Sequence, residues 1–221
     1  MIDMLKSIGI EKGKQFSPDA KTKSILETAA REARAQIEMR YEAGFSPPFY
    51  ESTRWAVPVP KATLDGMSTM FADPNTYPVD GRAIYFSIAY FSAKHLGTGQ
   101  FYIMTLKDGA GQSLDGRKAY KLTVPPNAPV SLYWSATAYD RETHALIRDT
   151  QRGSRASNSA GVQKNADGSV DVYSAPKAPT GKESNWVPTG GRDFEVLFRV
   201  YGPQKAFFDK TWKLPDVERV K

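Results

Sequence analysis

The stretch Val130-Ser-Leu-Tyr-Trp-Ser-Ala-Thr-Ala-Tyr-Asp140 decides the fold that this sequence predicts. Its apolar residues alternate with mostly polar ones, which is the period of two typical of a strand with one buried face. The opposite face carries two tyrosines among hydroxyl residues, so we expect it to be partly exposed to solvent. Because the run is about twice the usual strand length, we interpret it as a central strand of an antiparallel sheet. The side expected to be buried comprises Val130, Leu132, Trp134, Ala136 and Ala138.

The length of the chain and its apolar pattern limit the classes of protein to which it can belong. The 221 residues are enough for one sizeable hydrophobic core. The longest apolar run, residues 83–93, is far shorter than the roughly 20 residues that cross a bilayer. The first ten residues include Asp3 and no long apolar segment, so we expect no signal peptide. The chain is therefore either a cytoplasmic protein or the later part of a longer one.

Charge and metal-ligating residues exclude several kinds of site. The 30 Lys and Arg exceed the 24 Asp and Glu, but they are spread along the chain rather than gathered in a stripe, so we predict no nucleic-acid partner. The sequence contains no cysteine, which excludes disulfides, zinc–thiolate sites and cysteine nucleophiles. The two histidines, His95 and His144, are far apart in the chain. We therefore predict no metal and no cofactor.

The first part of the chain predicts helices and proline-rich connectors. A helix of about 25 residues should begin after Ser17, which suits an N-cap, and end at Gly44. The dense apolar residues of 82–96 favour a buried helix, although their high β propensity leaves a strand open. We accordingly divide the chain into an extension over residues 1–97, packed on the body, and a β-rich body over residues 98–221.

The remainder of the chain has the short alternating runs and glycine turns of an all-β domain. With about seven strands at close spacing, it predicts a mainly β fold with N-terminal helices, either an antiparallel β-sandwich or a jelly roll. A short helix should follow the last strand, over residues 204–209. Besides the central strand, the predicted strands are Gln100–Leu106, Ala119–Val124, Ala145–Arg148, Val170–Tyr173 and Phe194–Tyr201.

Five blocks of sequence carry a resemblance to a known family. They occur in the order Tyr133–Asp140, Asn165–Ser169, Lys182–Pro188, Leu197–Tyr201 with Pro203, and Asp209–Pro215. In that order they resemble the bacterial family called domain of unknown function 1214, over residues 80–221. The resemblance implies a jelly-roll-like β-sandwich and brings no activity with it. Members usually follow a partner, domain of unknown function 1254, in a longer and often exported protein, which implies a periplasmic or secreted location. The segment Asp149–Ser157 departs from the family pattern, so no role is transferred to it.

The β-rich part contains residue types that suit a binding surface. Aromatic faces stack on sugar rings, while Arg and Asn donate hydrogen bonds to carboxylates or hydroxyls. The same residues also suit structural roles, with Trp186 as a core anchor, Asn185 as a turn cap and Arg199 paired with Glu195 or Glu183. The candidate ligand-binding residues are Tyr133, Tyr139, Arg152, Arg155, Asn185, Trp186, Arg199 and Tyr201.

Two classes of function follow from these residues. The first is a ligand-binding or assembly module of an envelope or secreted protein, with a polar or saccharide-like ligand and a second copy or a partner domain. The second is a hydrolase or lyase acting on a polar, saccharide-like substrate, with Asp, Glu, Tyr or Arg as acid, base and charge stabiliser. A deep pocket in which a carboxylate or histidine meets Arg199 or Tyr201 would favour the enzyme. A flat aromatic face with no enclosed acid would favour binding or assembly.

Overall fold

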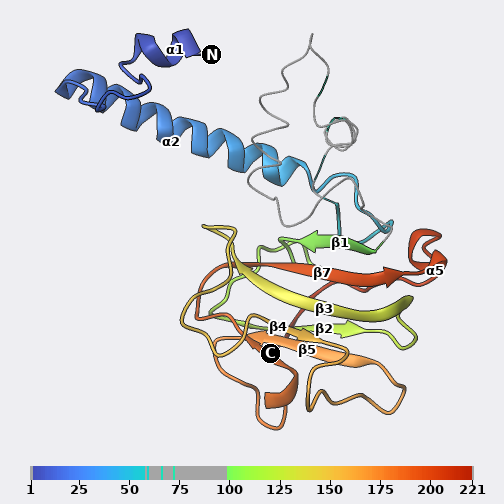
Figure 1. Ribbon diagram of the computed structural model, residues 1–221. Coiled ribbons are helices and arrows are strands. Elements are labelled where there is room, and N and C mark those ends of the chain that lie inside the picture. The colour runs from blue at the N-terminus through green and yellow to red at the C-terminus, as the bar shows by residue number, and fades with distance from the viewer. Residues whose placement is uncertain (1, 58, 60–65, 67–71, 73–98, 221) are drawn as a thin grey trace. The chain divides into compact units, whose positions relative to one another are not determined.

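The computed structural model describes residues 2–57, 59, 66, 72 and 99–220 (Figure 1). The chain divides into two compact units, Met1–Arg40 and Tyr41–Lys221. The boundary predicted at residue 97 and the helix predicted over residues 82–96 both lie outside the described residues.

Two helices occupy the beginning of the chain, α1 (Ile2–Ser7) and α2 (Ala20–Ala43). The end of α2 before Gly44 was predicted correctly, but its cap is Asp19 rather than Ser17. The carboxylate of Asp19 accepts a hydrogen bond of 2.7 Å from the amide of Thr22. The bonds from Thr22 hold the pKa of Asp19 below its usual value. Among the described helices, none combines the length and apolar character that a membrane crossing needs.

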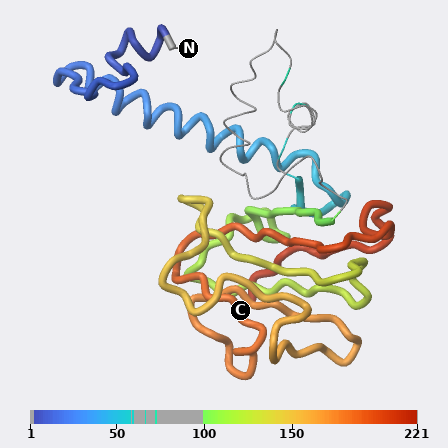
Figure 2. Tube along the Cα trace, viewed as in Figure 1, coloured from blue at the N-terminus to red at the C-terminus, as the bar shows by residue number. Residues whose placement is uncertain are grey.

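In the described residues, eight strands form two four-stranded sheets. The first sheet has the order β1 (Gln100–Thr105), β7 (Phe194–Pro203), β3 (Val130–Asp140) and β4 (Ser154–Ala156). The second sheet has the order β6 (Trp186–Pro188), β5 (Val170–Ala175), β2 (Ala119–Val124) and β8 (Glu218–Val220). All neighbours are antiparallel except β5 and β6. The chain crosses repeatedly from one sheet to the other, as Figure 2 shows. This arrangement confirms the mainly β fold and is consistent with a sandwich.

The central strand was predicted with its observed bounds, and β3 lies between β7 and β4. Two details of the prediction were wrong. Leu132 is 72 % exposed, because the pairing with β7 shifts register between Val130 and Tyr133. The face expected to be partly wet is buried at Ser135, Thr137 and Tyr139. Both faces of β3 are therefore covered along its second half.

One hydrophobic core joins the inner faces of the two sheets. Trp134 of β3 stacks on Phe198 of β7, with ring centroids 5.7 Å apart. Leu122 of β2 and Val172 of β5 belong to the same cluster of buried residues. Since these side chains come from both sheets, the two layers are held together by apolar burial.

Short elements account for most differences from the predicted strands. Residues Ala145–Arg148 pair back on β3 through an isolated bridge between Leu146 and Tyr139, whereas β4 makes the ladder with β3. The strands β6 and β8 were not predicted, because each is 3 residues long and shows no alternation. The predicted final helix is present as α5 (Lys205–Phe208).

Gly116 provides a test of the contact between two loops of the second unit. A Cβ at Gly116 would lie 1.9 Å from the carbonyl oxygen of Arg192, and the hydroxyl of Thr189 donates to the carbonyl of Gly116. We expect Gly116→Ala to lower the free energy of unfolding by about 1–3 kcal/mol or more, because backbone must move. Gly99→Ala is the control, since its added Cβ meets no atom of the described residues within 4 Å. Urea unfolding followed by tryptophan fluorescence measures both, and equal midpoints would contradict the close approach.

Candidate functional site

A group of polar aromatic side chains surrounds one arginine on the outer face of the first sheet. We call it the tyrosine–arginine cluster. Strand pairing assembles it, because Tyr102 of β1 lies opposite Arg199 of β7, and Tyr133 of β3 lies opposite Tyr201 of β7. Directly opposite residues project from the same face of a sheet. The cluster comprises Tyr102, Tyr133, Thr137, Tyr139, Arg199 and Tyr201.

The guanidinium of Arg199 is held from several sides. It donates a hydrogen bond of 2.9 Å to the hydroxyl of Thr137 and another to the hydroxyl of Tyr139. Its central carbon lies 5.5 Å from the ring centroid of Tyr102 and 5.5 Å from that of Tyr139. Cation–π attraction and hydrogen bonds therefore fix the orientation of a side chain that is otherwise flexible.

Arg199 has no carboxylate partner among the residues that the structure describes. The sequence had left open a pairing with Glu195 or Glu183. Instead, Glu195 accepts hydrogen bonds elsewhere, and the Glu183 carboxylate accepts from the amide of Gly181. A half-buried cation without a counter-ion is costly unless an anion is supplied. The cluster thus has positive charge available for a ligand.

Two tyrosines of the cluster, Tyr102 and Tyr201, have a raised pKa. Tyr133 and Tyr201 stack with ring centroids 4.2 Å apart and an angle of 20° between the rings. Burial and the hydrogen bond shared with Tyr133 raise the pKa of Tyr201. Burial, with the neighbouring Tyr201, raises the pKa of Tyr102 to about 12 although Arg199 opposes this. The phenols of Tyr102 and Tyr201 are therefore suited to hydrogen bonding rather than to removing protons.

Two of the predicted residues lie at the second sheet and hold the backbone there. The side-chain amide of Asn185 is buried and donates to the carbonyls of Gln163 and Asp171, both at 2.8 Å. Its oxygen accepts from the amide of Gln163 at 2.8 Å. The indole of Trp186 donates to the carbonyl of Ala175 at 2.9 Å. Asn185 and Trp186 are thus apart from the cluster and tie β5, β6 and the loop before β5 together.

The other two predicted arginines are also separate from the cluster. Arg155 of β4 lies opposite Ala136, a core residue, so it projects from the inner side of the first sheet. Its Nε is buried without a hydrogen-bond partner in the described part of the chain. Arg152 makes a long contact of 3.4 Å with the carbonyl of Glu183. The structure therefore brings together Tyr133, Tyr139, Arg199 and Tyr201, and leaves the other four outside.

A buried carboxylate on the same face was not predicted. Glu195 is fully buried and lies opposite Tyr139. It accepts a bond of 2.9 Å from the hydroxyl of Tyr41, and Nδ1 of His144 lies 3.1 Å from its Oε1. Glu195 and Arg199 fall at alternating positions along β7 and therefore share a face. This alternation is visible in the sequence and could have predicted Glu195. Two further residues of the cluster were also missed: Thr137 alternates on β3 with Tyr133 and Tyr139, and Tyr102 joins the cluster through the pairing of β1 with β7.

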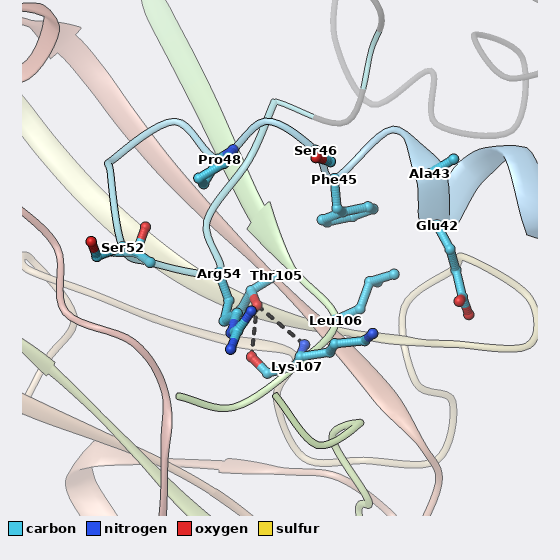
Figure 3. Close-up of a pocket in the computed structure, with 11 residues that line it drawn as sticks. Glu42, Ala43, Phe45, Ser46, Pro48, Ser52, Arg54, Thr105, Leu106 and Lys107 are labelled. Atoms are coloured by element: carbon cyan, nitrogen blue, oxygen red, sulfur yellow. Dashed lines mark hydrogen bonds between the residues drawn. The ribbon is translucent and has the colours of Figure 1, made fainter. Parts of the chain in front are cut away.

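A cleft of about 600 Å³ lies elsewhere in the second unit (Figure 3). Its lining comes from residues 42–54 and 105–107 and includes neither Arg199 nor Tyr201. No group of three or more metal-ligating side chains occurs in the described part of the chain. An enzyme would be favoured by a deep pocket at Arg199 or Tyr201. This cleft is lined by neither residue, so it is not that pocket.

The fold and the cluster define a mainly β domain with a polar aromatic face on one sheet. Residues 99–205 match the model of the family described as "Protein of unknown function (DUF1214)", which supports the resemblance seen in the sequence. The association with domain of unknown function 1254 stays a prediction. No curated protein matches the chain.

One solved structure resembles this chain in fold, and a second is similar over part of the chain. The crystal structure of the VPA0106 protein from Vibrio parahaemolyticus has 21% identity and a TM-score of 0.51, covering 100% of this chain and 50% of that chain. A crystal structure of an uncharacterized protein from Burkholderia cenocepacia has 18% identity and a TM-score of 0.37, covering 72% of this chain and 48% of that chain. The chain thus spans about half the length of these structures.

Two buried tyrosines test the bond to the buried carboxylate. Tyr41 and Tyr50 are both fully buried, but only the hydroxyl of Tyr41 is bonded to Glu195, whereas that of Tyr50 has no partner in the described residues. We expect Tyr41→Phe to lower the free energy of unfolding by about 1–3 kcal/mol, since a buried carboxyl group loses a hydrogen-bond donor. Tyr50→Phe should leave stability unchanged or raise it. Denaturant titration of both variants checks this, and equal losses would argue against the Tyr41–Glu195 bond.

Proposed function

We propose that the domain is a ligand-binding module whose tyrosine–arginine cluster takes the carboxylate of a polar, saccharide-like ligand. One observation carries the proposal: the half-buried guanidinium of Arg199 is fixed between the rings of Tyr102 and Tyr139, with no carboxylate partner in the described part of the chain. A planar guanidinium and a planar carboxylate match in shape and charge.

The bonding capacity of Arg199 supports this role. A guanidinium carries more N–H donors than its bonds to Thr137 and Tyr139 use. Because these bonds hold the group in place before a ligand arrives, little side-chain freedom remains to be lost on binding. The half-buried rings of Tyr133 and Tyr201 lie on the same face and supply aromatic surface for a sugar ring.

The alternative function is catalysis by a hydrolase or lyase. The properties of the candidate acid and base groups argue against it. Burial raises the pKa of both Tyr102 and Tyr201, so neither is a ready base at neutral pH. Glu195 and His144 are buried and hydrogen-bonded to each other, which removes them from contact with a substrate at the surface. These features favour binding over a reaction.

The proposal extends to the setting of the domain. We place it in an envelope or secreted protein, where it assembles with a second copy or with a partner domain. Two features support assembly: the chain spans about half the length of the VPA0106 structure, and Leu132 and Leu146 are 72 % and 55 % exposed. Exposed apolar side chains of this size are often covered by a neighbouring protein.

Galacturonate and galactose provide a matched pair of probes, because they differ in a carboxylate at one carbon of the same sugar. We expect galacturonate to bind with a Kd at least about tenfold lower than galactose, since a hydrogen-bonded charge adds that much. Titration followed by ¹H–¹⁵N NMR measures both Kd values and places the shifted amides on β1, β3 and β7.

Variants separate this site from general charge effects. Arg199→Gln should abolish the preference for galacturonate. Arg152→Gln removes the same charge outside the cluster and should preserve it. Equal affinity for the two sugars, no binding of galacturonate, or an unchanged preference in Arg199→Gln would each contradict the proposed ligand.

A further inference from the structure

The cleft of about 600 Å³ in Figure 3 has the size of a small-molecule site. One wall is the end of α2 with the segment that follows it, from Glu42 to Arg54, and the other is the end of β1 with the two residues after it, over 105–107. Apolar and polar groups both reach it. Its lining comprises Glu42, Ala43, Phe45, Ser46, Pro48, Ser52, Thr53, Arg54, Thr105, Leu106 and Lys107.

The two walls are joined by backbone bonds and a buried tryptophan. Ala56 and Met104 exchange hydrogen bonds of 2.9 and 2.8 Å, which dock the first wall on β1. Trp55 is fully buried, and its indole donates to the carbonyl of Pro215 at 2.9 Å. The cleft therefore exists before any ligand arrives, which reduces the cost of binding.

The charge of the lining is positive. Arg54 and Lys107 are exposed and form no ion pair with any residue that the structure describes. Glu42 is the acid of the lining, and its carboxylate already accepts a bond of 3.0 Å from Arg141. Outside the lining, the Asp216 carboxylate also interacts electrostatically with Arg54. The cleft is nevertheless attractive to anions, because Lys107 forms no ion pair in the described part of the chain and Glu42 is already bonded to Arg141.

Local contacts position both cations. The hydroxyl of Thr105 donates to the carbonyl of Lys107 at 2.7 Å and accepts from its amide at 3.2 Å, which fixes the turn that carries Lys107 (Figure 3). The guanidinium of Arg54 lies against Gly111, where an added Cβ would be 3.3 Å from Nη2. The amide of Arg54 donates to Asp216 at 2.7 Å.

We propose that this cleft is a second binding site, which takes a small organic anion with an apolar body. Arg54 and Lys107 contact the anionic group, and Phe45, Pro48 and Leu106 contact the apolar part. The anion is a carboxylate or a phosphate, which share this chemistry. The site is separate from the tyrosine–arginine cluster and has no residue in common with it.

Benzoate, phenyl phosphate and benzyl alcohol test the proposal, because they share a ring and differ in charge. In ¹H–¹⁵N NMR titrations of the full chain, we expect one or both anions to shift amides of residues 45–54 and 105–107. The Kd of the better anion should be about tenfold or more below that of benzyl alcohol. Tighter binding of benzoate identifies a carboxylate ligand, and tighter binding of phenyl phosphate identifies a phosphate.

A double variant and a matched control complete the experiment. Arg54→Gln with Lys107→Gln should raise the Kd of the better anion about tenfold or more, whereas Lys164→Gln, an exposed lysine outside the lining, should leave it unchanged. The substituted side chains are exposed, so unfolding midpoints should stay close to that of the parent. Equal affinity for benzyl alcohol, no effect of the double variant, or shifts confined to the cluster around Arg199 would overturn the proposal.

Discussion

The pairing of β3 with β7 is the constraint on which the rest of the structure depends. Its register places Trp134 beside Val200 and Ala136 beside Phe198 on the inner face, and Tyr133 beside Tyr201 on the outer face. A slip of one residue would exchange these faces, burying tyrosines in the core and exposing the tryptophan. The same register therefore makes the hydrophobic core and the polar cluster, and neither can change without the other.

Local patterning in the sequence accounts for the parts of the fold that were predicted. Alternation over residues 119–124 and 130–140 located β2 and β3 with their observed bounds. It did not find β6 or β8, because 3 residues are too few to show a period. The exposed Leu132 was misplaced because a shift of register depends on the partner strand, which alternation alone does not reveal.

The candidate site was predicted in part for the same reason. Tyr133, Tyr139, Arg199 and Tyr201 share a face because they fall at alternate positions of two strands that pair. Asn185 and Trp186 were chosen by residue type, and the structure uses their polar groups to bind backbone carbonyls. The contact between Tyr41 and Glu195 joins positions 154 residues apart, so no local sequence pattern predicts it.

The account rests on Arg199 and Tyr139 being joined across β3 and β7, and a double-mutant cycle measures that contact directly. Unfolding free energies of the parent, Arg199→Gln, Tyr139→Phe and the double variant give the coupling between the two side chains. The account predicts a favourable coupling of about 0.5–1.5 kcal/mol, the range of one hydrogen bond. Additive effects with no coupling would contradict the register, and with it the cluster that depends on it.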